Sequence, residues 1–549
     1  MNALYYGDNL HVLRNEIKDE SVDLIYLDPP FNSKRDYNLL FKSPKGHESE
    51  AQITAFEDSW HWATTEGSQA EKEFDDIIHG KNTQLADIMR ALRSFLGEND
   101  MMAYLTMMAN RLIELHRVLK PTGSLYLHCD PTASHYLKIV LDGVFGKTNF
   151  RNEISWRRSQ PKSHTTFNFS NCRDIIFRYS KTEQVVFNKA FGEHDPSYIE
   201  NFYKFTEKDG RRYRLGDITN PNKNRPNLTY EFLGVTRVWR WTKARMQKAY
   251  DDGIIYQSKP GNVPQEKRYL DEMEGQPISD DWDDIEHLQG GVRPNSDSET
   301  LGYPTQKPLA LLERIIEVSS NEGDVVLDPF CGCGTAVHAA QKLKRNWIGI
   351  DVTHLAISLI EKRLNDAFND IKKPKSEHVC QFEVHGTPKD LGGATDLALR
   401  DKYQFQWWAV SLVDAQPFGG KKKGADGGVD GIKFFRDIDQ KEARKIVVSV
   451  KGGGLKADDI RSLMAVRKRE NAEIALFISL EPPTKGMIGD AASEGFYESP
   501  NGKKFPRVQL LTIEDLLSGK QRAEHPDYLP DLNFKKAKTE ASGEQKKLL

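Results

Sequence analysis

Two apolar segments that each run into an aspartate and a proline constrain this chain most strongly. They are VDLIYLDPP at residues 22–30 and VVLDPF at residues 325–330. Proline has no backbone N–H and cannot continue the hydrogen-bond ladder inside a sheet, so each segment predicts a short strand that stops at a carboxylate. The first segment adds an aromatic residue, Phe31, directly after its prolines.

Strand and helix patterns alternate around both segments. A strand, a helix and a second strand are predicted twice, at residues 22–27, 104–119 and 124–128, and again at 325–327, 335–343 and 347–350. This alternation predicts an α/β fold with a parallel sheet of the doubly wound kind. His128 and Asp130, at the end of the 124–128 run, are interpreted as ordinary strand-end residues.

The segment DPFCGCGT at residues 328–335 predicts a glycine-rich turn between a strand and a helix. Gly332 and Gly334 allow a ligand to approach the backbone, and Asp351 ends the next strand, where it can accept hydrogen bonds from ribose hydroxyls. Neither a phosphate-binding GxxxxGK[ST] motif nor a complete GxGxxG motif is present. Asp328 would repel pyrophosphate but attract a cation, so the pattern favours S-adenosylmethionine, which carries an ammonium and a sulfonium group.

Residues 151–300 differ in composition from the segments on either side. The chain has a net charge of −3, yet residues 151–248 contain about 20 basic and about 10 acidic side chains, interleaved with Trp and Tyr. Cations bind phosphates and planar side chains stack on bases, so this region predicts contact with nucleic acid.

Length and composition limit the class of protein. A chain of 549 residues is expected to form two to four domains. We find no run of about 18 apolar residues and no basic segment followed by an apolar one near the N-terminus, so neither a membrane span nor a signal peptide is expected. Five cysteines in a chain of this length fit a reducing cytoplasm.

Together, DPPF at 28–31, YPTQKP at 303–308 and DPFCGCGT at 328–335 resemble the motifs of the S-adenosylmethionine-dependent DNA amino-methyltransferases. Their order, with GDN at 7–9, resembles the permuted β group of these enzymes. The resemblance implies a Rossmann-like methyltransferase sheet with an inserted target-recognition region. It also implies catalytic roles for Asp28, Pro29, Pro30 and Phe31, and cofactor contacts by Asp8, Thr305, Gln306, Lys307, Asp328, Phe330, Gly332, Gly334, Thr335 and Asp351.

The expected chemistry is direct attack by an exocyclic amine of a flipped base on the sulfonium methyl group. Asp28 and a proline carbonyl would accept the amine hydrogens, and Phe31 would stack on the base. In this family an aspartate at the first motif position usually accompanies adenine N6 and a serine cytosine N4, so adenine is expected and cytosine N4 is the alternative. The expected partners are double-stranded DNA and a second copy of the chain or a separate restriction subunit, in restriction-modification or phage defence.

The C-terminal region resembles the metal-dependent PD-(D/E)xK nuclease core in its Mrr-like form. Asp430 would bind Mg²⁺ and Lys451 would orient the attacking water, so a bifunctional methyltransferase and endonuclease is a further alternative. Ser449 stands where the pattern expects an acid or Gln, so either the cleavage site is weakened or Asp426 compensates; the alternative is a domain that only binds DNA. The predicted domain boundaries are 1–150, 151–300, 301–372 and 378–525, followed by a polar tail at 526–549.

Overall fold

The computed structural model describes most of the chain as two compact units. The described residues are 2–30, 36–42, 48–57, 62, 69–161, 167–192, 194–288, 299–301, 303, 305–369, 380–418, 428–438 and 442–526. One unit contains the residues up to Asn188 together with those from Asp280 on, and the other contains Lys189–Ser279. Each unit is described separately below.

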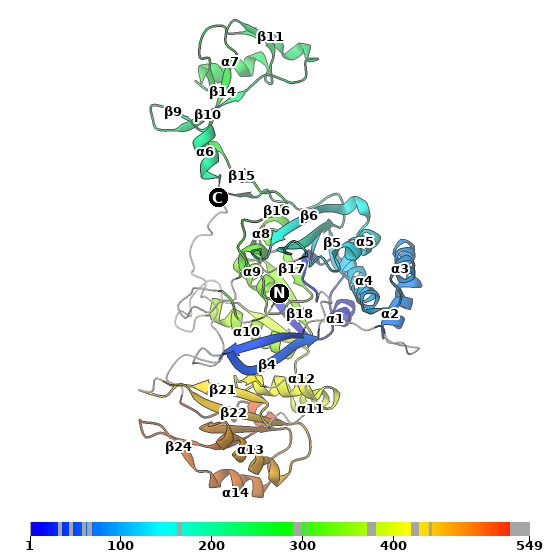
Figure 1. The fold of residues 1–549 in the computed structure, drawn as a ribbon, viewed down its shortest axis with the longest axis vertical. Coiled ribbons are helices and arrows are strands. Elements are labelled where there is room, and N and C mark those ends of the chain that lie inside the picture. The colour runs from blue at the N-terminus through cyan, green and yellow to red at the C-terminus, as the bar shows by residue number, and fades with distance from the viewer. Residues whose placement is uncertain are drawn as a thin grey trace. The chain divides into compact units, whose positions relative to one another are not determined.

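A nine-stranded sheet forms the centre of the larger unit (Figure 1). Its strand order is β16-β6-β7-β5-β2-β17-β18-β1-β19. In this order the bounds are Asp281–Trp282, Phe150–Arg157, Arg173–Ser180, Leu119–Cys129, Val22–Leu27, Val325–Asp328, Asn346–Asp351, Asn2–Tyr6 and Phe382–His385. The two predicted strand–helix–strand segments therefore lie side by side, because β2 pairs with β17.

The sheet is mixed, which corrects the prediction of a parallel sheet. The six strands from β5 to β19 run parallel, but β7 is antiparallel to both β5 and β6. The reason is the connection after β5. Helix α5 (Ser134–Phe145) carries the chain to β6, and the chain then returns as β7 in the gap between β6 and β5.

Helices pack against the β5 side of this sheet and form its main core. Helix α4 (Asp100–Val118) is buried over most of its length, and it contacts α5 and α2 (Gln69–Ile78), while α3 (Thr83–Leu96) contacts α5 (Figure 1). Leu105, Met108 and Leu112 of α4 are fully buried. Helix α1 (Asn9–Asn15) also packs on α4, so the turn that precedes α1 has a fixed position.

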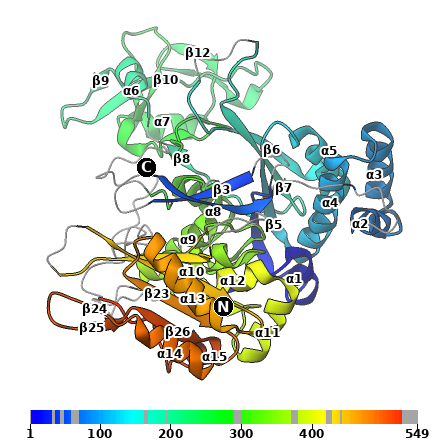
Figure 2. The same cartoon turned by 60° about the horizontal axis from the view of Figure 1, so that its bottom comes forward.

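A second, five-stranded sheet lies in the C-terminal part of the larger unit. Its strand order is β20-β21-β22-β23-β26, with bounds Gln416–Pro417, Gly431–Phe435, Arg444–Lys451, Ile474–Ser479 and Val508–Thr512. Helices α11 (Leu391–Arg400) and α12 (Lys402–Ser411) contribute to the core on one face, and α13 (Ala457–Arg469) and α14 (Lys485–Ser493) to the core on the other. Helix α12 contacts α10 (His354–Phe368), the helix that follows β18 of the first sheet (Figure 2).

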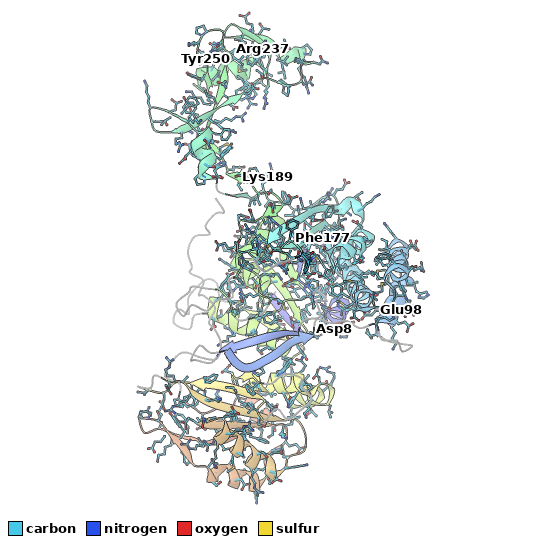
Figure 3. All side chains as sticks on the ribbon, in the orientation of Figure 1. Asp8, Glu98, Phe177, Lys189, Arg237 and Tyr250 are labelled. Atoms are coloured by element: carbon cyan, nitrogen blue, oxygen red, sulfur yellow. The ribbon has the colours of Figure 1, made fainter. Side chains whose placement is uncertain are left out.

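The smaller unit covers a narrower range than the predicted insert. Strands β6 and β7 fall within residues 151–300 but pair in the main sheet, so the separate unit begins only at Lys189. Trp239 is fully buried in its core, beside α7 (Lys243–Asp251). Arg237 on β12 (Val235–Val238) and Tyr250 on α7 are exposed; Figure 3 labels both.

Within the described segments, none of the helices combines the length and the apolar character needed to cross a bilayer.

Candidate active site

A cavity of about 930 Å³ opens at the carboxyl ends of β2, β17 and β18. Its volume is in the range of small-molecule sites, and strand carboxyl ends are where open α/β sheets bind ligands. The predicted residues that line it are Asp8, Asp28, Pro29, Pro30, Thr305, Gln306, Lys307, Asp328, Phe330, Gly332, Thr335 and Asp351. The strand-end motifs that begin at Asp28 and at Asp328 are 300 residues apart in sequence and line the same cavity. Phe31 lies outside the described residues.

The glycine-rich turn after β17 has backbone conformations that favour glycine. Gly332 has a φ of 50° and Gly334 a φ of 75°, and Gly334 caps the N-terminus of α9 (Thr335–Lys342). A Cβ atom at Gly334 would lie 2.7 Å from Cγ1 of Ile360, so a larger residue there would also displace α10. Gly332 lines the cavity, whereas Gly334 packs against Ile360 and is not among the lining residues.

Asp351 holds this turn from the end of β18. Its Oδ2 accepts a hydrogen bond from the Gly332 N–H at 2.9 Å, and its Oδ1 accepts from the backbone N–H and the hydroxyl of Thr353, each at 2.9 Å. Burial raises the pKa of Asp351 to about 6, although these hydrogen bonds act in the opposite direction. The carboxylate is therefore mostly ionised at pH 7 and can accept further hydrogen bonds from a ligand.

Asp328 at the end of β17 is 4% exposed. Burial raises the pKa of this carboxyl well above its usual range, and the nearby Asp28 and Asp351 carboxylates raise it further. Its Oδ1 accepts a hydrogen bond from the Phe330 N–H at 3.1 Å. A cation entering the cavity would reverse this shift, because it would favour the ionised carboxylate.

Asp28 lies at the end of β2, where the two prolines stop the strand. Its Oδ2 forms an ion pair with the Lys307 ammonium group, and both side chains are largely buried. Its Oδ1 is buried and, among the described residues, has no hydrogen-bond partner. A buried acceptor without a donor is costly, so this atom is available for a donor supplied by a ligand.

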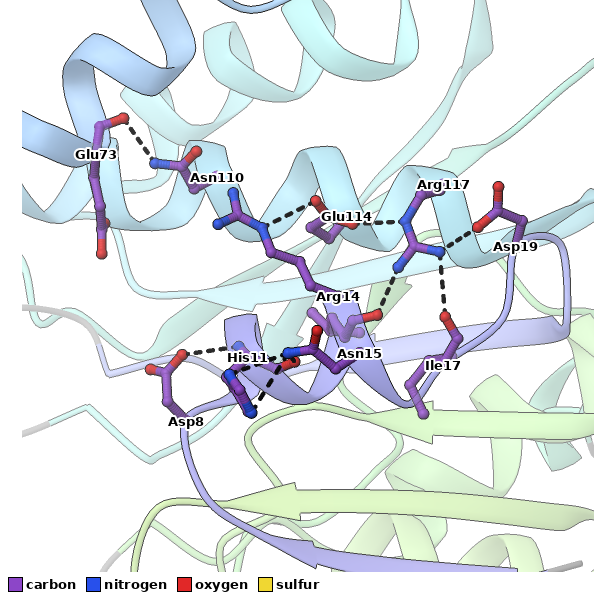
Figure 4. A network of polar contacts seen from close by, with 11 residues as sticks. Asp8, His11, Arg14, Asn15, Ile17, Asp19, Glu73, Asn110, Glu114 and Arg117 are labelled. Carbon is purple, nitrogen blue, oxygen red and sulfur yellow. Dashed lines mark hydrogen bonds and ion pairs between the residues drawn. The ribbon is translucent and has the colours of Figure 1, made fainter.

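Asp8 is positioned by the packing of α1 on α4. It caps α1 by accepting a hydrogen bond from the His11 N–H at 3.1 Å, and its Oδ2 pairs with Nη2 of Arg111 at 2.8 Å. Figure 4 shows the contact that joins the two helices, the pairing of Arg14 on α1 with Glu114 on α4; Glu114 also pairs with Arg117 within α4. These contacts fix the start of α1 at the edge of the cavity.

Gln306 lies in the cavity wall, but its amide group binds the preceding segment. Its Nε2 donates to the Glu299 carbonyl at 2.8 Å, and its Oε1 accepts from the Leu301 N–H at 2.7 Å. These contacts shape the segment that presents Lys307, and the cofactor contact that the resemblance implies for Gln306 stays a prediction.

Two buried arginines support the site and were not predicted. Arg363 of α10 donates to the Cys333 carbonyl and to the Thr335 hydroxyl, each at 3.1 Å, so it holds the glycine-rich turn from behind. Arg111 of α4 donates to Oδ1 of Asn9 at 2.6 Å, and Asn9 in turn donates to the Pro329 carbonyl at 2.8 Å. No sequence motif marks these arginines, because each acts through a long-range contact.

His128 also has more contacts than a strand-end residue requires. It is fully buried, and its Nε2 lies 3.1 Å from Oδ2 of Asp174, while its Nδ1 lies 3.1 Å from the Tyr26 hydroxyl. Tyr26 lines the cavity, so this buried chain ends at the site. Asp130, by contrast, binds its own turn through Thr132.

The residues predicted for a nuclease site lie on the second sheet. Asp430 precedes β21, and its Oδ2 accepts a hydrogen bond from the Val450 N–H at 2.7 Å. Lys451 at the end of β22 pairs with Oδ1 of Asp459 at 3.2 Å. Within the part of the chain that the structure describes, no group of three or more His, Cys, Asp or Glu side chains could hold a metal ion. Asp426 lies outside that part.

Comparison with known proteins agrees with this geometry. Residues 22–362 match the family model N6_N4_Mtase, described as DNA methylase. The type II methyltransferase M.EcaI of Enterobacter cloacae is 33% identical over 267 residues, which cover 48% of this chain and 57% of that protein. The type III restriction-modification enzyme StyLTI Mod subunit of Salmonella typhimurium is 28% identical over 355 residues, which cover 62% of this chain and 50% of that protein.

Among solved structures, the M1.HpyAVI–SAM complex aligns with a TM-score of 0.31 and 17% identity, over 66% of this chain and all of that one. The chain spans about half the length of the first two curated relatives. The family match covers more than half of this chain, including both strand-end motifs and the glycine-rich turn. This chain therefore belongs to the DNA methylase family.

Proposed function

We propose that this chain transfers a methyl group from S-adenosylmethionine to the N6 amine of adenine in double-stranded DNA. The observation that carries the proposal is the shared cavity, which Asp28 and its two prolines line together with Asp351 and the glycine-rich turn. The first group suits an exocyclic amine and the second a nucleoside. A methyl donor and its acceptor can meet only where the two groups share one space.

The residues around the cavity fit S-adenosylmethionine. Asp351 offers an ionised acceptor for ribose hydroxyls, and Asp328 offers a buried carboxyl that a cationic amino-acid end would ionise. Gly332 lines the cavity without a side chain, and a Cβ atom there would lie 3.3 Å from Cε1 of Tyr303, which also lines the cavity. When bound, the cofactor supplies an electrophilic methyl group on its sulfonium.

Asp28 is the residue that would activate the acceptor amine. Its unpaired Oδ1 can accept one amine hydrogen while its Oδ2 stays with Lys307. Localising that hydrogen makes the nitrogen lone pair available for attack, and the Lys307 ammonium keeps the carboxylate from being an isolated buried charge. Because the nucleophile is the substrate amine, the mechanism needs no cysteine nucleophile.

The target base distinguishes the proposal from its nearest alternative, methylation of cytosine N4. The aspartate at position 28 supports adenine. The test is to methylate plasmid DNA with the purified chain, digest it to nucleosides and analyse these by mass spectrometry. N6-methyladenine supports the proposal and N4-methylcytosine would replace it. If neither methylated nucleoside forms and the protein does not bind S-adenosylmethionine, the proposed function itself is overturned.

We further propose that the smaller unit, Lys189–Ser279, contacts the DNA. Exposed Arg and Lys side chains on this unit suit phosphate binding; Arg237, labelled in Figure 3, is one of them, and Lys243 is another. M.EcaI, named as a type II methyltransferase, and the StyLTI Mod subunit support a place in restriction-modification, with a restriction subunit as the proposed partner. Binding to a labelled duplex at increasing salt would test this, because a phosphate-dominated interface loses affinity steeply as salt rises.

DNA cleavage by the C-terminal sheet stays a prediction of the sequence. Asp430 already accepts a backbone hydrogen bond, and Ser449 replaces the expected second ligand. Among the described residues, no group of three or more His, Cys, Asp or Glu side chains is placed to hold Mg²⁺.

A further inference from the structure

The cavity has one wall that the methyltransferase motifs do not supply. Four residues from the end of α11 and from α12 line it: Arg400, Asp401, Gln404 and Trp407. These helices pack on the second sheet and form part of its core. They also lie outside residues 22–362, the range matched by the family model.

A buried hydrogen bond fixes α12 to the cofactor-binding segment. Oε1 of Gln404 accepts from the backbone N–H of His354 at 3.2 Å, and both residues are buried. His354 is the first residue of α10, where backbone N–H groups have no partner within the helix. Asp351 lies only three residues earlier, so Gln404 helps to hold the turn that presents this carboxylate.

The strand before α11 is joined to the same region. Strand β19 pairs in parallel with β1, and Gly386 follows it into the cavity wall. Gly386 has a φ of 80°, and a Cβ atom there would lie 2.2 Å from the Tyr6 carbonyl oxygen. The backbone at Gly386 therefore lies very close to the Tyr6 carbonyl group. The chain continues from this point to α11 and α12, which reach the cavity.

The new wall faces the end of the cavity that contains Asp351. Tyr6 and His354 stack there with ring centroids 3.5 Å apart, and Val352 is 57% exposed although it is apolar. Burial raises the pKa of Tyr6 to about 12, and the nearby Asp401 carboxylate adds to the effect. Next to an acid placed for ribose hydroxyls, the exposed Val352 and the Trp407 ring provide apolar surface for a purine.

We propose that α12 forms the adenosine-side wall of the cofactor pocket, with Trp407 as a cofactor-binding residue and Gln404 as a positioning residue for the Asp351 turn. The inference rests on the proposed function, because it takes S-adenosylmethionine as the ligand. It goes further in giving the C-terminal sheet a part in cofactor binding. Occupancy of the pocket would then stabilise the junction between the two sheets.

The test compares two adjacent tryptophans of α12 in the full chain. Both are 5% exposed, but Trp407 lines the cavity whereas Trp408 packs in the core of the second sheet. We expect Trp407→Leu to weaken S-adenosylmethionine binding by about tenfold in calorimetry, and Trp408→Leu to change it less than about twofold even where it lowers the melting temperature. Equal affinities for the wild type and Trp407→Leu would overturn the inference.

Hydrogen exchange of the wild-type chain provides a readout that needs no variant. Adding S-adenosylmethionine should slow exchange in peptides covering residues 396–408 as well as 326–355. Protection of 326–355 alone would remove α12 from the pocket and leave the proposed function standing. A wild type that shows no heat of binding and no protection anywhere would instead overturn the proposed function.

Discussion

Two strand-end regions of this chain carry similar residues in different surroundings. Asp351 ends β18 of the large sheet, and Asp430 precedes β21 of the small one. Both carboxylates accept backbone N–H groups, from Gly332 and from Val450. Asp351 also lines a cavity of about 930 Å³, together with residues from distant parts of the chain. Lys451, which was predicted to share a nuclease site with Asp430, instead pairs with Asp459.

The difference shows that an acid at a strand end becomes part of a binding site only where several other segments of the chain meet it in one cavity. At Asp351, the ends of β1, β2 and β17, the Lys307 segment and α12 all meet. Buried, oriented polar groups in a shared cavity can act together on one ligand. At Asp430, the described neighbours form no cluster that could hold a metal ion.

The largest expected effect on activity separates Asp28, which lines the same cavity as Asp351, from Asp430. Asp28→Ala should lower the rate of methyl transfer by about 10³-fold, since it removes an acceptor that acts on the reacting amine. Cofactor affinity should change little, because Asp28 would face the amine. The control, Asp430→Ala, should leave methyl transfer unchanged. Single-turnover transfer of labelled methyl groups to DNA measures both, and an active Asp28→Ala protein would rule out the mechanism.

Removing the cofactor acid should have the next largest effect. Asp351→Ala loses the acceptor for the ribose and also the hydrogen bonds that hold Gly332 and Thr353. We expect S-adenosylmethionine to bind about 10²-fold more weakly, by analogy with other charged hydrogen-bond acceptors. Calorimetric titration of the folded variant measures this loss. An unchanged affinity would place the adenosine elsewhere.

Glycine substitutions compare the backbones of the two regions. Gly334→Ala puts a Cβ atom at a φ of 75° and 2.7 Å from Ile360, and should cost about 2 kcal/mol of unfolding free energy. Gly453→Ala, after β22, meets no atom within 4 Å and should cost less than about 0.5 kcal/mol. Urea denaturation of both variants would measure the costs. Equal costs would mean that the turn is not constrained as described.

Cofactor binding should weaken in acid. Burial raises the pKa of Asp351 to about 6, and ribose hydroxyls need the ionised form as acceptor. Below pH 6 the protonated form therefore dominates, and affinity should fall about tenfold for each pH unit. Calorimetric titrations with S-adenosylmethionine from pH 5 to pH 8 measure how the affinity depends on pH. In an Asp351→Asn variant, the part of this pH dependence that Asp351 causes should be absent.

The smallest effect is expected at the end of β22. Lys451 is 44% exposed and pairs with Asp459, and exposed ion pairs contribute less than about 1 kcal/mol. Lys451→Ala should therefore barely change stability or methyl transfer. Incubating plasmid with Mg²⁺ and each protein tests the nuclease interpretation directly. Cleavage by the wild type that this variant loses would show that the second region is also a catalytic site.

Local patterns predicted the elements that carry the motifs. The strand expected at 22–27 is β2, and the run expected at 347–350 lies within β18, because continuous apolar segments between breakers mark buried strands well. The strand expected at 124–128 begins earlier than predicted, at Leu119, because the turn residues Lys120 to Gly123 lie within an irregular part of β5.

Long-range contacts could not be predicted in the same way. Strands β6 and β7 lie in a basic region that the composition assigned to an insert, yet they complete the main sheet. Arg363 and Gln404 carry no local signal, since their partners are 28 to 50 residues away. Charge composition describes a surface, whereas strand pairing depends on geometry that one sequence does not display.

The pairing of β1 has a consequence for how the chain is made. This strand begins at Asn2, and its partners in the sheet are β18 and β19, which begin at Asn346 and Phe382. At typical rates of synthesis, roughly 20 to 80 seconds would pass before the ribosome has released the second partner. An apolar segment that waits so long with unpaired edges is a natural client for a chaperone. The finished pocket is thus among the last features to form.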